Sequence, residues 1–533
     1  MLRKLFRFKG GVEPVTHKSA SAQAPIGKHP LPSQLILPLH QNVGARAIPC
    51  VRVGETVLKG QRIGAADGWI SAAVHAPTSG KVLAIEDRLA THPSGLSTLS
   101  VIIEPDGLDT WIERRPLDYA TLAPDEVRKA LRDAGIVGLG GAVFPTHAKL
   151  SAAKSTAMEF VVINGAECEP FVTCDDLLMR ERAEDIVHGA SIFRDLLEPR
   201  RVLIGIEDNK PEAAVAMRRA VETLGFDFEV VVVPTRYPTG AAKQLIRVLT
   251  GKEIPSTRRS PEMGVQCFNV GTAYSTWRFV AFGEPLISRI VTLTGNVKIA
   301  GNWETLIGTP FGEFVAIGCP KPDTGGFLMG GPMMGFEIPG LSAPVVKACN
   351  CVIVAATPLF PPPRPEMPCI RCGACAHVCP HELQPFELYR FSRAKKFDKT
   401  IKLSIDECIE CGCCAYVCPS RIPLVRYFRF AKSEIAARRK ETEKAAATRF
   451  RIEGRKKRDE RMKAEKAERL QKATAKTSGA GDADATKRAL IEAAVERARL
   501  QRETQAAKNA ETAGNRETAL EKNPAVRPND VAG

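Results

Sequence analysis

Nine of the 16 cysteines in this chain lie in two short runs, and eight of the nine follow one shared spacing. The first run, CIRCGACAHVCP, begins at Cys369, and the second, CIECGCCAYVCP, begins at Cys408. Each run reads C-x2-C-x2-C-x3-C-P. Thiolates this close together bind zinc, bind iron–sulfur clusters or pair as disulfides. The chemistry of the chain depends on which of these three the runs do.

The spacing favours iron–sulfur clusters. A disulfide framework is typical of short secreted chains, whereas this chain has 533 residues and begins MLRKLFRFKGGVEP, without the apolar run of a signal peptide. A structural zinc site uses two C-x2-C pairs, and the third cysteine and the proline of each run have no part in it. The pattern is that of bacterial two-cluster ferredoxins, in which the fourth cysteine of each run ligates the other cluster.

We therefore predict two [4Fe–4S] clusters with exchanged ligands, which would carry single electrons. The predicted ligands are Cys369, Cys372, Cys375 and Cys418 for cluster 1, and Cys408, Cys411, Cys414 and Cys379 for cluster 2. Gly373 and Gly412 would let each loop curl round its cluster, and Cys413 is predicted to be a thiol that binds no iron. Clusters hold no substrate, so the chain must contain an electron source or receive electrons from a partner.

The best candidate for that source is the glycine-rich stretch GIVGLGGAVFPTHAKL, which begins at Gly135. Its glycines lack the last position of the G-x-G-x-x-G dinucleotide fingerprint and follow a predicted helix, so a Rossmann site is not expected. The loop is instead predicted to open a helix near Pro145, where free N–H groups and the helix dipole favour a phosphate. Lys149 would add a positive charge one turn into that helix.

A second candidate segment follows about twenty residues on, where the predicted strand FVVI ends in Asn164 and continues as GAECEP. Polar residues just beyond the carboxyl end of a parallel strand lie where open α/β sheets bind ligands. Either segment alone would be interpreted as an ordinary turn. Together, in a chain with iron–sulfur ligands, they favour a cofactor site.

Several segments, taken in order, resemble the C subunit of the Rnf/Rsx ion-translocating electron transport complex. They are FKGGVEP, GLGGAVFPTHAK, VVINGAECEPFVTCDD, YPTGAAKQLI, FNVGTAYS, GGPMMG and the paired cysteine runs, which together cover about residues 5–435. That family is also similar to the NADH-binding flavoprotein subunit of respiratory complex I, which has comparable glycine-loop and N-x-x-E-x-E-P segments.

The resemblance implies that FMN is the cofactor and NADH the substrate. It places Gly138, Gly140, Gly141 and Lys149 around the FMN phosphate, and Asn164, Glu167, Gly240 and Asn269 around the rest of the flavin. It places Phe144 and Glu169 where the complex I relative contacts the nicotinamide dinucleotide. Two positions depart from that relative, because Ala166 replaces an acid and Ala241-Ala242 replace paired glutamates.

The elements that position these residues are predicted to form a multidomain α/β and all-β chain. Short strands between glycines predict an N-terminal barrel-sandwich hybrid, whose exposed hairpin, Ile70 to Ala73, lacks the lysine that would carry a swinging cofactor. We interpret it as a docking module. The predicted domains are that lipoyl-like unit in 1–118, a complex-I-flavoprotein-like α/β domain in 119–284, a small β-grasp-type ligand-binding domain in 285–357, a two-[4Fe–4S] ferredoxin-like domain in 358–432 and a charged tail in 433–533.

The tail carries much of the positive charge. It has 25 Lys/Arg and 17 Asp/Glu, so +8 of the formal +15 lies there, and Phe450 is its one aromatic residue. A chain this polar buries too little apolar surface to offset ordering entropy, so we predict a helix-prone, largely disordered tail. With a single aromatic residue for base stacking, nucleic-acid binding is not expected, and an acidic protein or anionic lipid would explain the charge.

We predict an NADH-oxidising, electron-transferring subunit of a membrane-bound ion-translocating oxidoreductase. The longest apolar window, CVIVAATPLF, is too short to cross a bilayer, so any membrane attachment would be peripheral. The resemblance implies a place at the cytoplasmic face of the bacterial inner membrane. The expected partners are the membrane ion-translocating subunits, an iron–sulfur subunit, and ferredoxin or an equivalent redox protein. Two alternatives remain, a ferredoxin-like relay without flavin and a non-enzymatic, metal-stabilised scaffold with a basic binding tail.

Overall fold

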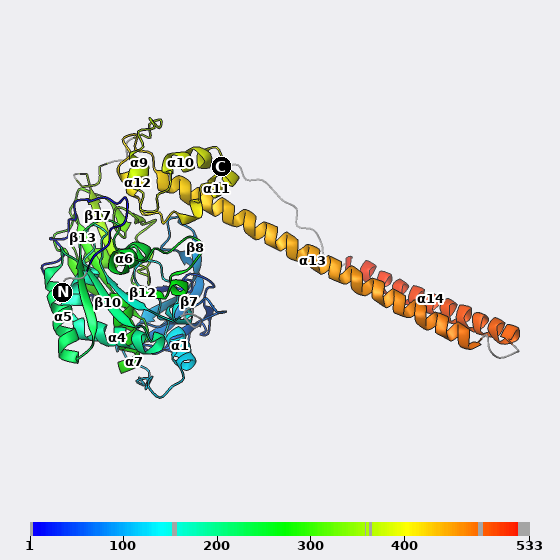
Figure 1. Cartoon of the computed structure of the whole chain (residues 1–533). Helices are drawn as coiled ribbons and strands as arrows, with labels where there is room; N and C mark the ends of the chain where they lie inside the picture. The colour runs from blue at the N-terminus through cyan, green and yellow to red at the C-terminus, as the bar shows by residue number, and fades with distance from the viewer. Residues whose placement is uncertain (1–3, 152–156, 358, 362–364, 478–482, 521–533) are drawn as a thin grey trace, which may run out of the picture. The chain divides into compact units, whose positions relative to one another are not determined.

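The computed structural model describes residues 4–151, 157–357, 359–361, 365–477 and 483–520. These residues form two compact units, Met1–Ile435 and Ala436–Gly533 (Figure 1). The end of the predicted tail and part of the proline-rich segment before the cysteine runs lie outside the described residues. Within the described ranges, no helix combines the length and the hydropathy needed to span a membrane.

The first part of the first unit is a β-sandwich of two facing sheets. Residues such as Leu35, Leu37 and Ile63 are fully buried in the core of this sandwich. One sheet has the order β2-β8-β7-β4, and the other the order β3-β5-β6. The strands are β2 (Leu35–Pro38), β3 (Ile48–Pro49), β4 (Thr56–Val57), β5 (Arg62–Ala65), β6 (Val74–His75), β7 (Gly80–Leu89) and β8 (Ser97–Pro105).

The loop between β5 and β6, which contains the lysine-free hairpin, contacts the α/β domain and the domain that follows it. Arg132 donates hydrogen bonds to the carbonyls of Ala66 and Gly68, at 3.0 and 2.7 Å. The buried ammonium of Lys347 donates to the Ala73 carbonyl at 2.8 Å. A hairpin held at three carbonyls has a packing role in this chain.

The α/β domain is built on a four-stranded, all-parallel sheet in the order β11-β10-β9-β12. Along β9, Val161 and Ile163 pack into one core and Phe160 and Val162 into another, so both faces of the sheet are covered. The strands are β9 (Phe160–Gly165), β10 (Arg201–Glu207), β11 (Phe228–Val233) and β12 (Val265–Asn269).

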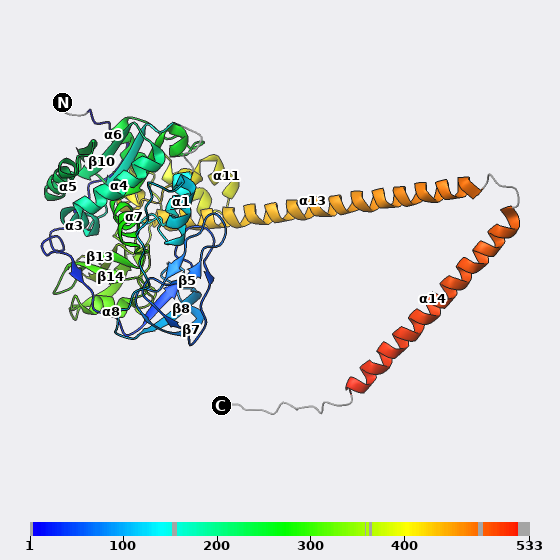
Figure 2. The ribbon, with the colours of Figure 1, turned by 90° about the horizontal axis from the view of Figure 1, so that it is seen from below.

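Helices cover both faces of this sheet, and Figure 2 shows α4 and α6 beside β10. Residues of α4 and α5 pack in the core that contains Val161, and residues of α6 pack in the core that contains Val162. The helices are α1 (Pro124–Asp133), α2 (Thr146–Ser151), α3 (Cys174–Glu181), α4 (Ala183–Leu197), α5 (Pro211–Leu224), α6 (Ala242–Thr250), α7 (Val270–Phe282) and a 3-10 turn, η1 (Ser260–Met263).

A six-stranded sheet follows the α/β domain, in the order β1-β14-β13-β17-β15-β16. An antiparallel hairpin, a helix and a central parallel pair of strands, β13 with β17, agree with the predicted β-grasp type. The edge strand β1 comes from the N-terminal segment, outside the predicted range for this domain, and pairs in parallel with β14. The elements are β1 (Gly27–Lys28), β13 (Ser288–Gly295), β14 (Gly301–Leu306), α8 (Phe311–Ala316), β15 (Thr324–Met329), β16 (Phe336–Glu337) and β17 (Cys351–Ala356).

The cysteine runs fold into a small helical domain. Gly373 and Gly412 each precede a one-turn helix with φ of 78° and 83°, a conformation that favours glycine. The helices are α9 (Ala374–His377), α10 (Pro385–Arg393), α11 (Phe397–Lys402), η2 (Ile405–Glu407), α12 (Cys413–Tyr416) and the start of α13 (Leu424–Thr477).

The tail is helical wherever the structure describes it, which corrects the prediction that it is largely disordered. Helix α13 runs through the predicted boundary at residue 433, because Phe428, Ala431 and Ile435 on its first turns are buried in the core of the cysteine domain. Beyond Ile435, pairs spaced four apart, such as Arg461 with Glu465 at 2.9 Å, support an exposed helix. The second tail helix is α14 (Ala483–Leu520).

Candidate functional site

The sheet order of the α/β domain places a candidate site at the carboxyl ends of β9 and β12. The chain leaves β9 towards β10 on one side and returns to β12 on the other, so the strand order reverses between these two neighbours. Open α/β sheets bind ligands at such a switch point. Asn164 and Asn269 are paired in register at the ends of these two strands.

The glycine loop lies directly over this point. A Cβ added at Gly140 would lie 3.5 Å from the Cβ of Asn269, and the N–H of Leu139 donates to Thr272 on α7 at 2.9 Å. Gly141 has φ of 104°, which favours glycine. Gly140, Gly141 and Ala142 are exposed or half-buried, and their N–H groups donate no hydrogen bond within the described residues. The loop thus offers free donors above the end of the sheet.

Helix α2 begins at Thr146, close to where the sequence predicted it. Its start is buried, and the Thr146 N–H donates to the Ile136 carbonyl at 3.2 Å, so the free donors lie earlier, in the loop itself. The Lys149 ammonium donates to the Cys267 carbonyl on β12 and lies 5.0 Å from the centre of the Phe268 ring. Burial lowers the pKa of Lys149. Lys149 therefore joins α2 to β12.

Asn164 joins two of the predicted segments. Its amide donates to the Gly240 carbonyl at 2.8 Å, and its side-chain oxygen accepts the Ala166 N–H at 3.1 Å. The Gly240 N–H donates to the Cys168 sulfur at 3.2 Å. A Cβ at Gly240 would lie 2.9 Å from that sulfur, so only glycine fits here. Gly240 and the Asn164 loop thus form one rigid wall of the candidate site.

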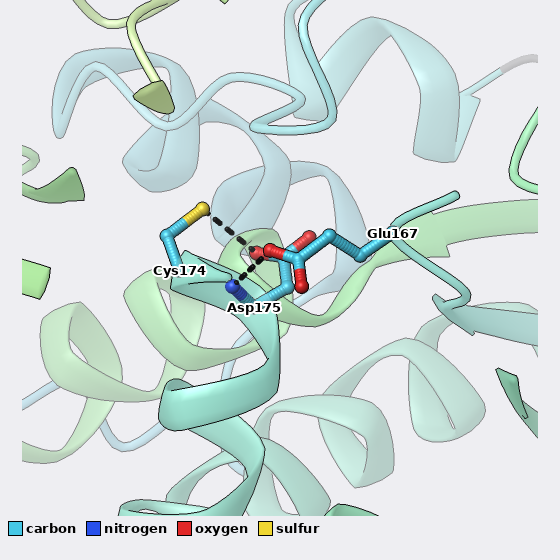
Figure 3. Close-up of side chains that lie close together, drawn as sticks. All are labelled: Glu167, Cys174 and Asp175. Carbon is cyan, nitrogen blue, oxygen red and sulfur yellow. Dashed lines mark hydrogen bonds between the residues drawn. The ribbon is translucent and has the colours of Figure 1, made fainter. Parts of the chain in front are cut away.

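The side chains of Glu167, Cys174 and Asp175 lie close together (Figure 3). Glu167, with φ of 48°, accepts the N–H groups of Asp175 and Asp176 at 2.7 and 3.3 Å and so caps the start of α3. Asn269 donates to Asp175 at 2.7 Å and accepts the Gly271 N–H at 2.8 Å at the start of α7. With their polar atoms engaged inside the chain, Glu167 and Asn269 fix the starts of two helices that point at the site.

Two buried lysines hold the loop that follows Asn164. Neither is among the site residues predicted from the sequence. Lys18 donates to the carbonyls of Glu167 and Glu169 at 2.8 and 3.0 Å. Lys210 donates to the Ala166 carbonyl at 2.7 Å and to Glu207 at 3.1 Å. The position of Lys210 just after β10, at the carboxyl edge of the sheet, was the available signal. No local pattern marks Lys18.

Burial, followed by the nearby carboxylate of Glu167, raises the pKa of Asp175 to about 7. In the unfolded chain this carboxyl loses its proton near 3.8. Between these values the folded protein binds a proton that the unfolded chain has released, so stability falls as pH rises.

We therefore expect Asp175→Asn to be progressively stabilising, relative to the natural chain, between pH 4.5 and about 7.5. The difference in Tm should grow by about 2–6 °C across that range, as measured by calorimetry of the intact protein. Asp67→Asn is the control, because Asp67 is exposed. A Tm difference that does not change with pH would contradict the prediction.

Glu169 and Phe144, predicted to contact the dinucleotide, occupy different settings. One Glu169 oxygen accepts the N–H groups of Met333 and Met334, at 2.7 and 3.1 Å. Glu169 therefore anchors the GGPMMG loop of the six-stranded sheet. A Cβ at Gly331 would lie 2.1 Å from the Glu169 side chain. Phe144 is half-buried, and its carbonyl accepts the Gly138 N–H at 2.9 Å, which closes the glycine loop.

The cysteines of the two runs line two separate cavities. The inner cavity is lined by Cys379, Cys408, Cys411 and Cys414, and the outer cavity by Cys369, Cys372, Cys375 and Cys418. The last cysteine of each run thus meets the first three of the other run, and four thiols around each cavity are a donor set that fits a [4Fe–4S] cluster. Cys413 is fully buried and lines the inner cavity as a fifth thiol.

The two cavities differ in their surroundings. Cys411 packs in one apolar cluster with Val12 of the N-terminal segment and Tyr237 of the α/β domain. Cys168 and Met333 pack beside them. Cys369 and Cys372 of the outer cavity are exposed. The inner cavity therefore lies next to the candidate flavin site, and the outer cavity opens to solvent.

Three family models match separate parts of the chain. Residues 6–108 match the RnfC barrel-sandwich hybrid domain, residues 131–278 the Nuo51 FMN-binding domain, and residues 368–422 the 4Fe-4S dicluster domain. Together with the parallel sheet, the glycine loop and the cysteine cavities, these matches define a flavin and iron–sulfur protein of electron transport.

Curated relatives narrow this class to one family. A protein of Haemophilus influenzae (strain PittEE) is 45% identical over 408 residues, 76% of this chain and 62% of the relative. One of Serratia proteamaculans (strain 568) is 44% identical over 490 residues, 91% of this chain and 69% of the relative. Both are named as the C subunit of the ion-translocating oxidoreductase complex, and this chain belongs to that family.

The chain spans 62, 61 and 48% of the first three of these relatives. Among solved structures, the NAD+-reducing [NiFe]-hydrogenase in its H2-reduced state matches 60% of this chain and 67% of the matched chain, with 18% identity and a TM-score of 0.44. The air-oxidised form matches with 20% identity and a TM-score of 0.42, over 52% of this chain and 54% of the other.

Proposed function

We propose that this chain oxidises NADH with FMN bound at the switch point of its α/β domain and passes electrons singly to two [4Fe–4S] clusters. The observation that carries the proposal is the convergence of the glycine loop, Asn164 and Asn269 at the ends of β9 and β12, next to a cavity lined by five cysteines. When bound, FMN supplies the chemistry that accepts a hydride and releases electrons one at a time.

The residues of the chain have binding and orienting roles in this proposal. The free N–H groups of Gly140, Gly141 and Ala142 would donate to the FMN phosphate, which favours backbone donors. Asn164, Gly240 and Glu167 would form the wall beside the flavin. Lys18 and Lys210 would hold this wall in place through their bonds to the carbonyls of Glu167 and Ala166. Gly138 keeps the loop closed through its bond to Phe144.

The cluster assignments follow the two cavities. Cys408, Cys411, Cys414 and Cys379 would hold the inner cluster, and Cys369, Cys372, Cys375 and Cys418 the outer one. Because the inner cavity borders the α/β domain and the outer cavity is exposed, electrons would enter at the inner cluster and leave at the outer. Cys413 would remain a free thiol.

We infer that ion movement requires other subunits. This chain would work at the cytoplasmic face of the bacterial inner membrane, bound to membrane subunits that move the ion and to an iron–sulfur subunit. Ferredoxin or an equivalent protein would be the redox partner at the other end of the electron path. The names of the relatives, which refer to an ion-translocating complex, support this assignment.

The decisive experiment is anaerobic purification followed by flavin, iron and activity measurements. We expect about one FMN and about eight irons per chain, and reduction of ferricyanide by NADH. A chain that holds iron but retains no FMN after reconstitution would instead be a relay without flavin, an alternative that Ala241-Ala242 favour. Zinc in place of iron would leave only the scaffold.

A side-chain variant tests the nucleotide part of the site. Phe144→Ala removes a half-buried ring next to the loop but leaves the backbone bond to Gly138. Loss of an aromatic contact worth about 0.5–1.5 kcal/mol should raise the KM for NADH roughly two- to tenfold, with FMN content unchanged. Phe144→Tyr, which keeps the ring, is the control. An unchanged KM in the alanine variant would remove Phe144 from the proposed site.

A further inference from the structure

The N-terminal motif FKGGVEP has no role in the function proposed above, yet it lies between the two redox domains. The Phe6 N–H donates to Val248 on α6 at 3.0 Å. Val12 and Tyr237 exchange both backbone hydrogen bonds, at 2.8 and 2.9 Å. Between these two anchors on the α/β domain, the Gly11 N–H donates to the Val378 carbonyl of the cysteine domain at 2.9 Å.

The two glycines of the motif allow backbone to pack directly on backbone. A Cβ at Gly10 would lie 2.6 Å from the carbonyl carbon and oxygen of Cys379, which lines the inner cavity. A Cβ at Gly11 would lie 2.8 Å from the Tyr237 carbonyl. Both glycines also have positive φ, of 68° and 85°. No larger residue fits between the cysteine run and Tyr237 without moving one of them.

Tyr237 holds the inner cavity from the same side. It is 2% exposed, and its hydroxyl donates to the Cys411 carbonyl at 2.6 Å. Three residues further on, Gly240 accepts the Asn164 amide at the wall of the flavin site. One short segment, Tyr237 to Gly240, therefore contacts both the second cysteine run, at Cys411, and the candidate flavin site.

A third contact fixes the same cysteine run. The Met333 N–H donates to Glu169 at 2.7 Å, and a Cβ at Gly412 would lie 2.6 Å from the Met333 carbonyl. The side chains around these contacts are apolar, with Val12, Val378, Ile409 and Val417 in one cluster. The junction between the domains is thus closely packed.

We propose that Gly10, Gly11 and Tyr237 form a brace that positions the inner cluster against the flavin site. This inference rests on the proposed function, because it concerns the step in which one electron passes from reduced flavin to the oxidised inner cluster. The brace residues are positioning residues. They touch the backbone of Val378, Cys379 and Cys411 and fix where the thiols of these two cysteines stand.

Glycine variants test the brace against matched controls. Gly10→Ala and Gly11→Ala are expected to lower the iron content from about eight to about four per chain, while FMN stays bound. The EPR spectrum after dithionite should lose the broadening caused by two neighbouring reduced clusters. The controls are Gly225→Ala and Gly54→Ala, whose φ values of 69° and 86° match but whose added Cβ would meet nothing within 4 Å.

Tyr237→Phe is a milder variant that keeps the buried ring and removes the hydroxyl, with its bonds to the Cys411 carbonyl and to Glu169. It should retain full iron and FMN and full NADH–ferricyanide activity. Reduction of the clusters by NADH, followed by stopped-flow spectroscopy, should slow about ten- to hundredfold, as expected for a small misplacement. A residue with only a structural role would change the rate of ferricyanide reduction and the rate of cluster reduction together.

The outcomes separate this inference from the proposed function. Iron content and dithionite EPR do not require NADH oxidation, so loss of the inner cluster in the glycine variants supports the brace even in a chain without FMN. If the glycine variants match their controls in iron and EPR, the brace is wrong. It is also wrong if Tyr237→Phe reduces its clusters at the natural rate.

Discussion

Cys379→Ala is expected to remove about half of the iron of the protein and to leave a cluster in the outer cavity. Cys379 belongs to the first cysteine run, but it lines the inner cavity with Cys408, Cys411 and Cys414 of the second run. Three thiols alone would hold that cluster poorly once its fourth ligand is gone. The remaining EPR signal should come from a cluster held by first-run cysteines and Cys418.

Cys413→Ala is the matched control for this experiment. Cys413 lines the same cavity and is fully buried, but it stands between two proposed ligands of the same run. We expect it to keep all of its iron. If Cys413→Ala loses iron as Cys379→Ala does, Cys413 is a ligand and the assignment must change. If Cys379→Ala instead affects the outer cluster, the exchange of ligands between the runs is wrong.

Gly140→Asp is expected to abolish FMN retention. The new carboxylate would stand within the exposed loop whose free N–H groups are proposed to bind the phosphate, on a Cβ that would lie 3.5 Å from the Cβ of Asn269. Like charges brought together at a binding site cost several kcal/mol, and ~3 kcal/mol corresponds to a roughly hundredfold weaker Kd. Quenching of FMN fluorescence on titration of the flavin-free protein measures this Kd directly.

The control for this variant is Gly140→Ala at the same position. A Cβ at Gly140 meets its nearest atoms at ordinary van der Waals distance, 3.5 Å or more, so the alanine variant should bind FMN within about threefold of the natural chain. Iron content and Tm should be unchanged in both variants. An aspartate variant that binds FMN normally would show that the phosphate lies elsewhere.

Much of the fold could be predicted because its signals are local. Alternation of helix and strand after Pro124 predicts a parallel sheet, and the strands at Phe160, Arg201 and Phe228 are parallel neighbours in it. The tail was harder to predict. Its composition predicts disorder, whereas the first turns of α13 are fixed by Phe428 and Ile435, which pack into the cysteine domain and extend the helix.

The candidate site was predictable only in part, because only some of its residues carry a local signal. Asn164 and the glycine loop carry recognisable turn and strand-end patterns, and the structure brings both to the junction of β9 and β12. Glu167 and Asn269 were predicted only as groups around the flavin. Their polar atoms also cap α3 and α7, which only the positions of those helices reveal.

The sequence alone determined the residue types and spacings that could do chemistry. Two cysteine runs with a proline after each fourth thiol predict clusters because the ligands of a cubane must lie close together along the chain. Tertiary structure decided what surrounds them. Lys18 meets the Glu167 loop across 149 residues, and Tyr237 meets Cys411 across 174. Contacts between residues so distant in sequence leave no local pattern, since they depend on how separately formed domains pack.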